Sequence, residues 1–141
     1  MTSKKFAEFE VLEGIEYLFK ELWPKMRYVN KSYQVCKNHV NTITILINNS
    51  LNVNDLLESL SRLEGIGYVI SSGLIYSMYE NKYVPFDKYT LEYSYRLNII
   101  PDTIINSNTY EKYSNKVVKY IKNSKSLNSI EDFVREAYVW C

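Results

Sequence analysis

Two features of this chain could do chemistry: a pair of closely spaced glycines and an aspartate that follows them. Gly65 and Gly67 flank a single isoleucine, and Asp87 lies twenty residues after Gly67. Leucines recur at helical spacing up to Leu63, so Gly65 is placed to close one helix in the left-handed conformation. A second helix then begins at Gly67. The spacing therefore predicts a helix-hairpin-helix over about 54–80.

The start of the second predicted helix could bind an anion. The backbone amides of Gly67, Tyr68 and Val69 have no partners within the helix, and the helix dipole favours negative charge there. A glycine at 67 lets a phosphate approach closely, while Ile66 is placed to pack between the two helices. These properties indicate nucleic acid as the partner. The alternative is an ordinary pair of helices whose glycines only end one and begin the other.

Asp87 has a structural interpretation beside a chemical one. Aspartate is a favoured N-cap, and a helix is expected to begin directly after it. A carboxylate could also stabilise positive charge that develops on a substrate, or orient an attacking water. The two roles are compatible, because a capping carboxylate can still face a cleft.

The residues around the glycines resemble the helix-hairpin-helix DNA glycosylase superfamily, in particular its endonuclease III-like group. The shared frame is Leu-x-x-Leu-x-Gly-Ile-Gly-x-x-x-Ser-Ser-x-Leu-Ile, beginning at Leu60, and it is followed by Pro85, Asp87 and the pair Arg96-Leu97. The resemblance is dense over these residues and weak elsewhere from Tyr28 to the C-terminus. It implies a reduced, all-α glycosylase core.

Carried over position by position, the resemblance assigns Gly65, Ile66 and Gly67 to a hairpin that binds the phosphate backbone of double-stranded DNA, with Tyr68 and Val69 beside it. It makes Asp87 the catalytic residue that promotes hydrolysis of the N-glycosidic bond of a damaged or modified base, as in base excision repair. That base must first be flipped out of the duplex. Tyr89 and Lys88, next to Asp87, are candidates for lining the site.

Three departures from the family limit what the resemblance implies. Val69 stands where strand-cutting members carry a nucleophilic lysine, so we expect a monofunctional glycosylase without lyase activity. The cysteines that hold an iron–sulfur cluster in many relatives are missing, since the chain has only Cys36 and Cys141. Cys36 and His39 lack a second pair of zinc ligands, so we expect no metal and no cofactor.

The N-terminal side is also shorter than in the family, where several upstream helices complete the base pocket. The alternative function is therefore a non-catalytic module that binds DNA or a protein partner. The base pocket separates the two hypotheses. If the helix over 4–22 and the segment 24–30 close over Asp87, a pocket exists; an Asp87 open to solvent would favour the module.

Length and composition limit the number of domains, the class of partner and the location that we expect. A chain of 141 residues is expected to form one domain over 1–141, and its net charge of +1 does not by itself indicate a nucleic-acid binder. No apolar run approaches the ~20 residues of a membrane span and no signal peptide is evident, so we expect a cytoplasmic protein. Five lysines without an acid occupy 112–125, which is either a solvated helix face or a basic stripe.

Helical periodicity extends through the whole chain and predicts an all-α fold. Helices are expected over about 4–22, 30–48, 54–63, 67–80 and 88–98. Two further helices should follow capping boxes, one from Asn108 to about 123 and one from Ser129 to Trp140. Asn54 or Asp55 is expected to cap the third helix.

Overall fold

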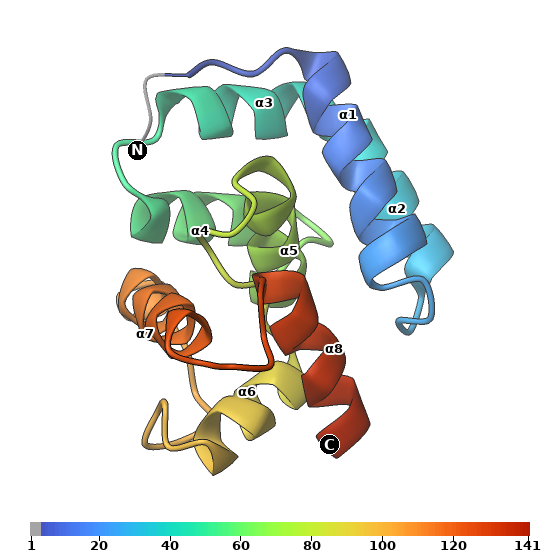
Figure 1. The fold of residues 1–141 in the computed structure, drawn as a ribbon. Coiled ribbons are helices and arrows are strands. Elements are labelled where there is room, and N and C mark those ends of the chain that lie inside the picture. Colours follow the sequence, from blue (N-terminus) through green and yellow to red (C-terminus); the bar gives the residue numbers. More distant parts are fainter. Residues whose placement is uncertain (1–3) are drawn as a thin grey trace.

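The computed structural model describes residues 4–141, and every regular element in this part of the chain is a helix (Figure 1). The all-α prediction is therefore confirmed. The elements, in chain order, are α1 (Glu8–Tyr17), a π-helical turn η1 (Leu18–Leu22), α2 (Val29–Asn38), α3 (Val40–Asn49), α4 (Val53–Ser61), α5 (Tyr68–Met78), α6 (Lys88–Arg96), α7 (Tyr110–Lys122) and α8 (Ile130–Trp140). None of the described helices is both long enough and apolar enough to cross a membrane.

The predicted helix over 30–48 is wrong in one respect, because it is two helices. The chain bends at His39, where φ is −99° and ψ is 10°, between α2 and α3. Both halves contact α1. Cys36 before the bend and Ile43 after it are both completely buried. The apolar repeat continues in register across the bend, so the periodicity could not reveal it.

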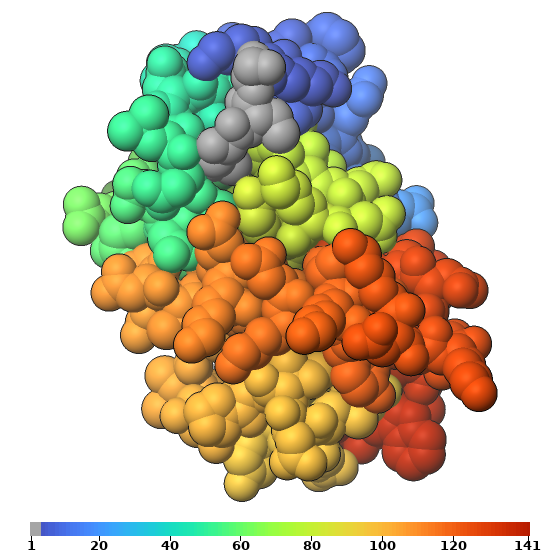
Figure 2. All heavy atoms as spheres, turned by 60° about the vertical axis from the view of Figure 1, so that its left-hand side comes forward, coloured from blue at the N-terminus to red at the C-terminus, as the bar shows by residue number. Residues whose placement is uncertain are grey.

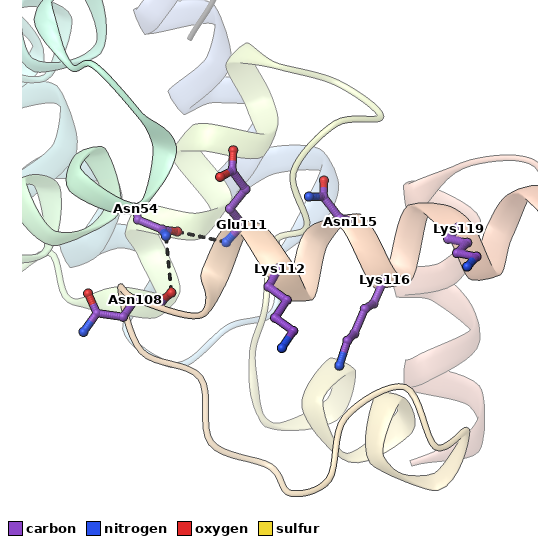
Figure 3. A pocket seen from close by; sticks show the side chains of 7 residues that line it. All are labelled: Asn54, Asn108, Glu111, Lys112, Asn115, Lys116 and Lys119. Carbon is purple, nitrogen blue, oxygen red and sulfur yellow. Dashed lines mark hydrogen bonds between the residues drawn. The ribbon is translucent and has the colours of Figure 1, made fainter.

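The predicted caps are partly wrong. Asn52 caps α4, accepting a hydrogen bond from the backbone N–H of Asp55 at 2.8 Å. Asn54 instead reaches the start of α7, where its Oδ1 accepts from the backbone N–H of Glu111 at 2.9 Å (Figure 3). The capping box expected at Asn108 does not form. The side chain of Asn54, from α4, instead supplies an acceptor for a backbone N–H in the first turn of α7. The cap at Ser129 is confirmed.

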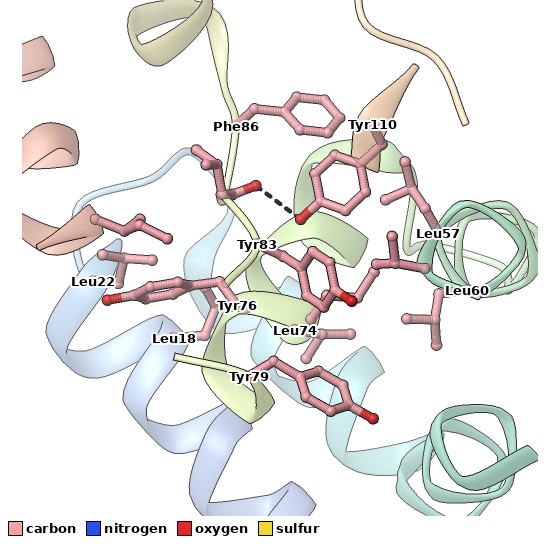
Figure 4. Close-up of a cluster of buried hydrophobic side chains, with 14 of the residues drawn as sticks. Leu18, Leu22, Leu57, Leu60, Leu74, Tyr76, Tyr79, Tyr83, Phe86 and Tyr110 are labelled. Atoms are coloured by element: carbon pink, nitrogen blue, oxygen red, sulfur yellow. Dashed lines mark hydrogen bonds between the residues drawn. The ribbon is translucent and has the colours of Figure 1, made fainter. Parts of the chain in front are cut away.

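The core is rich in tyrosine as well as leucine (Figure 4). Tyr110 is completely buried, and its hydroxyl donates to the backbone carbonyl of Val84 at 2.8 Å. Burial raises the pKa of Tyr110 well above its ordinary value. Tyr113 is equally buried and shares a 2.8 Å hydrogen bond with the hydroxyl of Ser94. Because both of these phenols have a partner, the rings of Tyr110 and Tyr113 fill the core without leaving their hydroxyls unpaired.

Candidate functional site

A short turn of six residues joins α4 to α5, and it contains the two glycines singled out above. Gly65 has φ +81° and Gly67 has φ +42°, both in the range that favours glycine. A Cβ at Gly65 would also lie 3.1 Å from a methyl group of Val35 in α2. Ile66 is 1% exposed, so it packs into the core as expected. The two helices contact each other along their length.

The N-terminus of α5 is open on its outer side. Within residues 4–141, no side chain caps it, and no neighbouring atom lies within 4 Å of the position that a Cβ of Gly67 would take. Tyr68 and Val69, the first two residues of α5, are exposed. The backbone N–H groups of this helix end are therefore accessible to an anionic ligand.

Tyr68 itself is held against α4. Its hydroxyl donates to Oε2 of Glu58 at 2.7 Å, and Oε1 of the same carboxylate lies 3.3 Å from Nε of Arg62. The hydrogen bond from Tyr68 is the main reason why the pKa of Glu58 is lowered. The side chain of Tyr68 thus links the start of α5 to α4.

Asp87 caps α6, as its structural interpretation predicts. Its Oδ1 accepts from the backbone N–H groups of Tyr89 at 3.0 Å and Thr90 at 2.9 Å. The hydroxyl of Thr90 accepts in return from the backbone N–H of Asp87, completing a capping box. The second oxygen, Oδ2, accepts a 2.6 Å hydrogen bond from the hydroxyl of Tyr138 in α8. The carboxylate is therefore fixed at both oxygens.

A cavity of about 740 Å³ lies beside Asp87. We call it the Asp87 cleft. Its walls come from residues 22–27, from Val69 at the start of α5, from residues 87–89, and from Tyr138 and Cys141 at the end of the chain. Of the two N-terminal segments whose position over Asp87 separates the two hypotheses, the helix over 4–22 and the segment 24–30, residues 22–27 line this cavity. The cleft also brings the start of α5 and Asp87 to one place.

The cleft combines aromatic walls with cationic side chains. Tyr89 and Tyr138 pack against each other with ring centroids 5.2 Å apart. The positive charges come from Lys25, Arg27 and Lys88, all exposed, against the single side-chain carboxylate of Asp87. Flat aromatic surfaces beside positive charge suit a heterocyclic base attached to a phosphate-bearing backbone.

Trp23 forms the deep wall of the cleft and is only 4% exposed. Its indole N–H has no acceptor among the described residues. The phenol of Tyr138 lies nearby. Burial is the largest cause of the raised pKa of Tyr138, the hydrogen bond to Asp87 adds to it, and the Trp23 side chain opposes it. Tyr138 therefore stays protonated and can donate to Asp87 throughout the physiological pH range.

Gly73 allows Trp23 to lie against α5. A Cβ at this position would come 2.6 Å from Cδ1 of Leu18 and 2.8 Å from Cζ3 of Trp23, both of which are buried. The third glycine of the run thus leaves room for the cleft wall, whereas Gly65 and Gly67 adopt the backbone conformations of the turn.

Gly73→Ala should destabilise the protein by about 1–3 kcal/mol, because the added methyl group overpacks a contact with Leu18 and Trp23, which the surrounding core confines. The measurement is urea unfolding followed by circular dichroism. Gly14→Ala is the matched control. Gly14 is also a helix-interior glycine, but its closest neighbour is the flexible Met78 sulfur at 2.8 Å. That variant should be neutral or more stable by up to about 1 kcal/mol, from helix propensity. Equal losses in both variants would contradict the assignment.

The sequence did not identify Trp23, Arg27 or Tyr138 as site residues. Trp23 lies between the predicted helix over 4–22 and the segment 24–30, and no motif marks it. Tyr138 is 51 residues from Asp87 and belongs to a different helix. No local spacing connects them, so only the packing of α8 on α6 reveals the contact.

The lysines of α7 form a separate surface. Lys112, Lys116 and Lys119 line a shallow depression of about 350 Å³ with several asparagines (Figure 3). α7 belongs to the orange segment that crosses the middle of the face in Figure 2. All three lysines are exposed, and none has an ion-pair partner within residues 4–141. None of them lines the Asp87 cleft, so this surface is separate from that site.

No family model matches the chain, and no curated protein and no solved structure matches it either. The described residues contain no group of three or more His, Cys, Asp or Glu side chains that could hold a metal ion. Cys36 is buried, and burial raises the pKa of its thiol to about 12. This thiol therefore contributes packing rather than reactivity.

Proposed function

We propose that this protein is a monofunctional DNA glycosylase of the helix-hairpin-helix type. In this proposal the turn at Gly65 to Gly67 binds the phosphate backbone of double-stranded DNA. Asp87 then promotes hydrolysis of the N-glycosidic bond of a damaged or modified base, a step of base excision repair. Neither a metal nor a cofactor takes part.

The observation that carries the proposal is the composition of the Asp87 cleft. The cleft joins residues 22–27, the hairpin helix at Val69 and the carboxylate of Asp87 around one cavity. Segments from three distant parts of the sequence thereby surround the residue that the family resemblance singles out. A carboxylate that only capped α6 would require no such surroundings.

The chemistry follows from the charge that a departing base leaves behind. As the N-glycosidic bond breaks, electrons move to the base and positive charge develops on the sugar. A fixed carboxylate next to the sugar stabilises that charge and can orient the attacking water. The cations of the cleft, Lys25, Arg27 and Lys88, would contact phosphates on either side of the flipped nucleotide.

The second candidate is a non-catalytic module that binds DNA or a protein. One observation favours it: four hydrogen bonds already engage the Asp87 carboxylate, three of them in the cap of α6. In the module, Asp87 is purely structural, and the cleft binds an unpaired base or a partner side chain without chemistry. The two candidates differ in one measurable outcome, the release of a free base.

The test is base release from a panel of duplexes that carry alkylated, oxidised, deaminated or mismatched bases. We expect release from at least one substrate, leaving an abasic strand that is intact until it is treated with alkali. Borohydride should trap no covalent protein–DNA complex, because Val69 cannot form a Schiff base. A trapped complex would contradict monofunctional chemistry. Binding of the duplexes without release of any base would favour the module.

A further inference from the structure

Tyr138 makes a hydrogen bond to Asp87 that the helix cap does not require. The cap of α6 is complete at Oδ1, where the carboxylate accepts from two backbone amides. The bond from Tyr138 goes to the other oxygen, Oδ2, and at 2.6 Å it has the short length of a hydroxyl–carboxylate bond. It joins the start of α6 to α8, and the two bonded residues are 51 positions apart in the sequence.

The two sets of bonds together define which part of the carboxylate remains available. An ionised carboxylate has about four acceptor sites, two on each oxygen. The amides of Tyr89 and Thr90 and, at 3.3 Å, the hydroxyl of Thr90 all donate to Oδ1, and Tyr138 occupies one site of Oδ2. One acceptor site of Oδ2 is left for a water or a substrate. The phenol also prevents the carboxylate from rotating about its terminal bond.

Tyr138 is itself held in place on the α6 side. Its ring packs against Tyr89, with centroids 5.2 Å apart. Further along α8, the ring of Phe133 packs against Tyr93 of α6 at 5.1 Å. At the end of α8, Nη1 of Arg96 donates to the carbonyl of Trp140 at 3.2 Å. Contacts on both sides of Tyr138 therefore fix the distance between its hydroxyl and Asp87.

We propose that Tyr138 is a positioning residue, which orients Oδ2 of Asp87 toward the cleft so that one acceptor site faces the reacting sugar or its water. This inference rests on the proposed glycosylase function. Tyr138 lines the same cavity as Asp87, so its hydroxyl lies at the edge of the site rather than behind it. It acts through the carboxylate and need not contact the substrate.

The experiment is a double-mutant cycle on the single-turnover rate of base release, with Tyr138→Phe, Asp87→Asn and the combination of the two. Tyr138→Phe keeps the ring against Tyr89 and removes only the hydroxyl. It should lower the rate roughly 10- to 100-fold, the scale of a small misplacement of a catalytic group. In the Asp87→Asn background the same change should cost less than about 2-fold, because it acts through the carboxylate. Duplex affinity should not change.

Tyr95→Phe is the matched control, since Tyr95 lies in α6, is 47% exposed and does not line the cleft. It should retain the wild-type rate. An equal loss from Tyr138→Phe in both backgrounds, or a loss of duplex affinity instead of rate, would overturn the positioning role. If Tyr138→Phe is as fast as wild type while Asp87→Asn is slow, only this inference fails. If the wild-type protein releases no base at all, the proposed function fails, and the positioning role with it.

Discussion

Asp87→Asn should lower the rate of base release by roughly 10²- to 10⁴-fold, because a neutral amide cannot stabilise the developing sugar cation. The fold should be retained. Asparagine is as good an N-cap as aspartate, and its side-chain oxygen can still accept from the backbone N–H groups of Tyr89 and Thr90. The measurement is single-turnover base release, with duplex affinity and the melting temperature recorded for the same samples. Affinity should stay nearly unchanged.

Asp55→Asn is the matched control for this substitution. Asp55 is also an aspartate at the start of a helix, in α4, and it does not line the Asp87 cleft. Its variant should release base at the wild-type rate. Wild-type release by Asp87→Asn would refute the catalytic assignment and leave Asp87 with the cap alone. A loss of duplex affinity that matches the loss of rate would place Asp87 in binding rather than in chemistry.

Local signals predicted the elements well. The positive φ angle of Gly65 and the cap at Asp87 follow from residue type within a few positions, so the sequence was sufficient for them. The bend at His39 was missed because the apolar repeat passes through it in register. Asn54 was assigned to its own helix, although its amide bonds to α7.

Only part of the candidate site could be predicted, because local spacing does not reveal contacts between distant helices. Asp87 and Val69 belong to a spacing that can be read along the chain. Trp23 and Tyr138 reach the cleft through the packing of η1 on α5 and of α8 on α6, and neither contact leaves a periodic trace. Gly73 belongs to the glycine run, but its role in making room for the cleft wall is evident only from the short distances between its Cβ position and the side chains of Leu18 and Trp23.

Gly67→Asp should abolish the duplex binding that the proposed function requires. The new carboxylate would stand at the open N-terminus of α5, where it can accept from the same backbone N–H groups that are proposed to hold a phosphate. It would also repel the phosphate directly. A like-charge contact costs several kcal/mol, so we expect affinity to fall roughly 100-fold or more. The measurement is fluorescence anisotropy with a labelled duplex over a series of salt concentrations.

The comparison with Gly67→Ala separates charge from backbone strain. Both variants place a side chain on a residue with φ +42°, and space is available for each, since no neighbouring atom lies within 4 Å of the Cβ position. The alanine variant should therefore have the same backbone strain as the aspartate variant but no added charge, and it should lose much less affinity for the duplex. For wild type, affinity should fall as salt rises, because phosphate contacts release counterions from the duplex. Equal affinity of Gly67→Asp and wild type would remove the turn from the DNA interface, and the cleft would then have to bind its ligand without it.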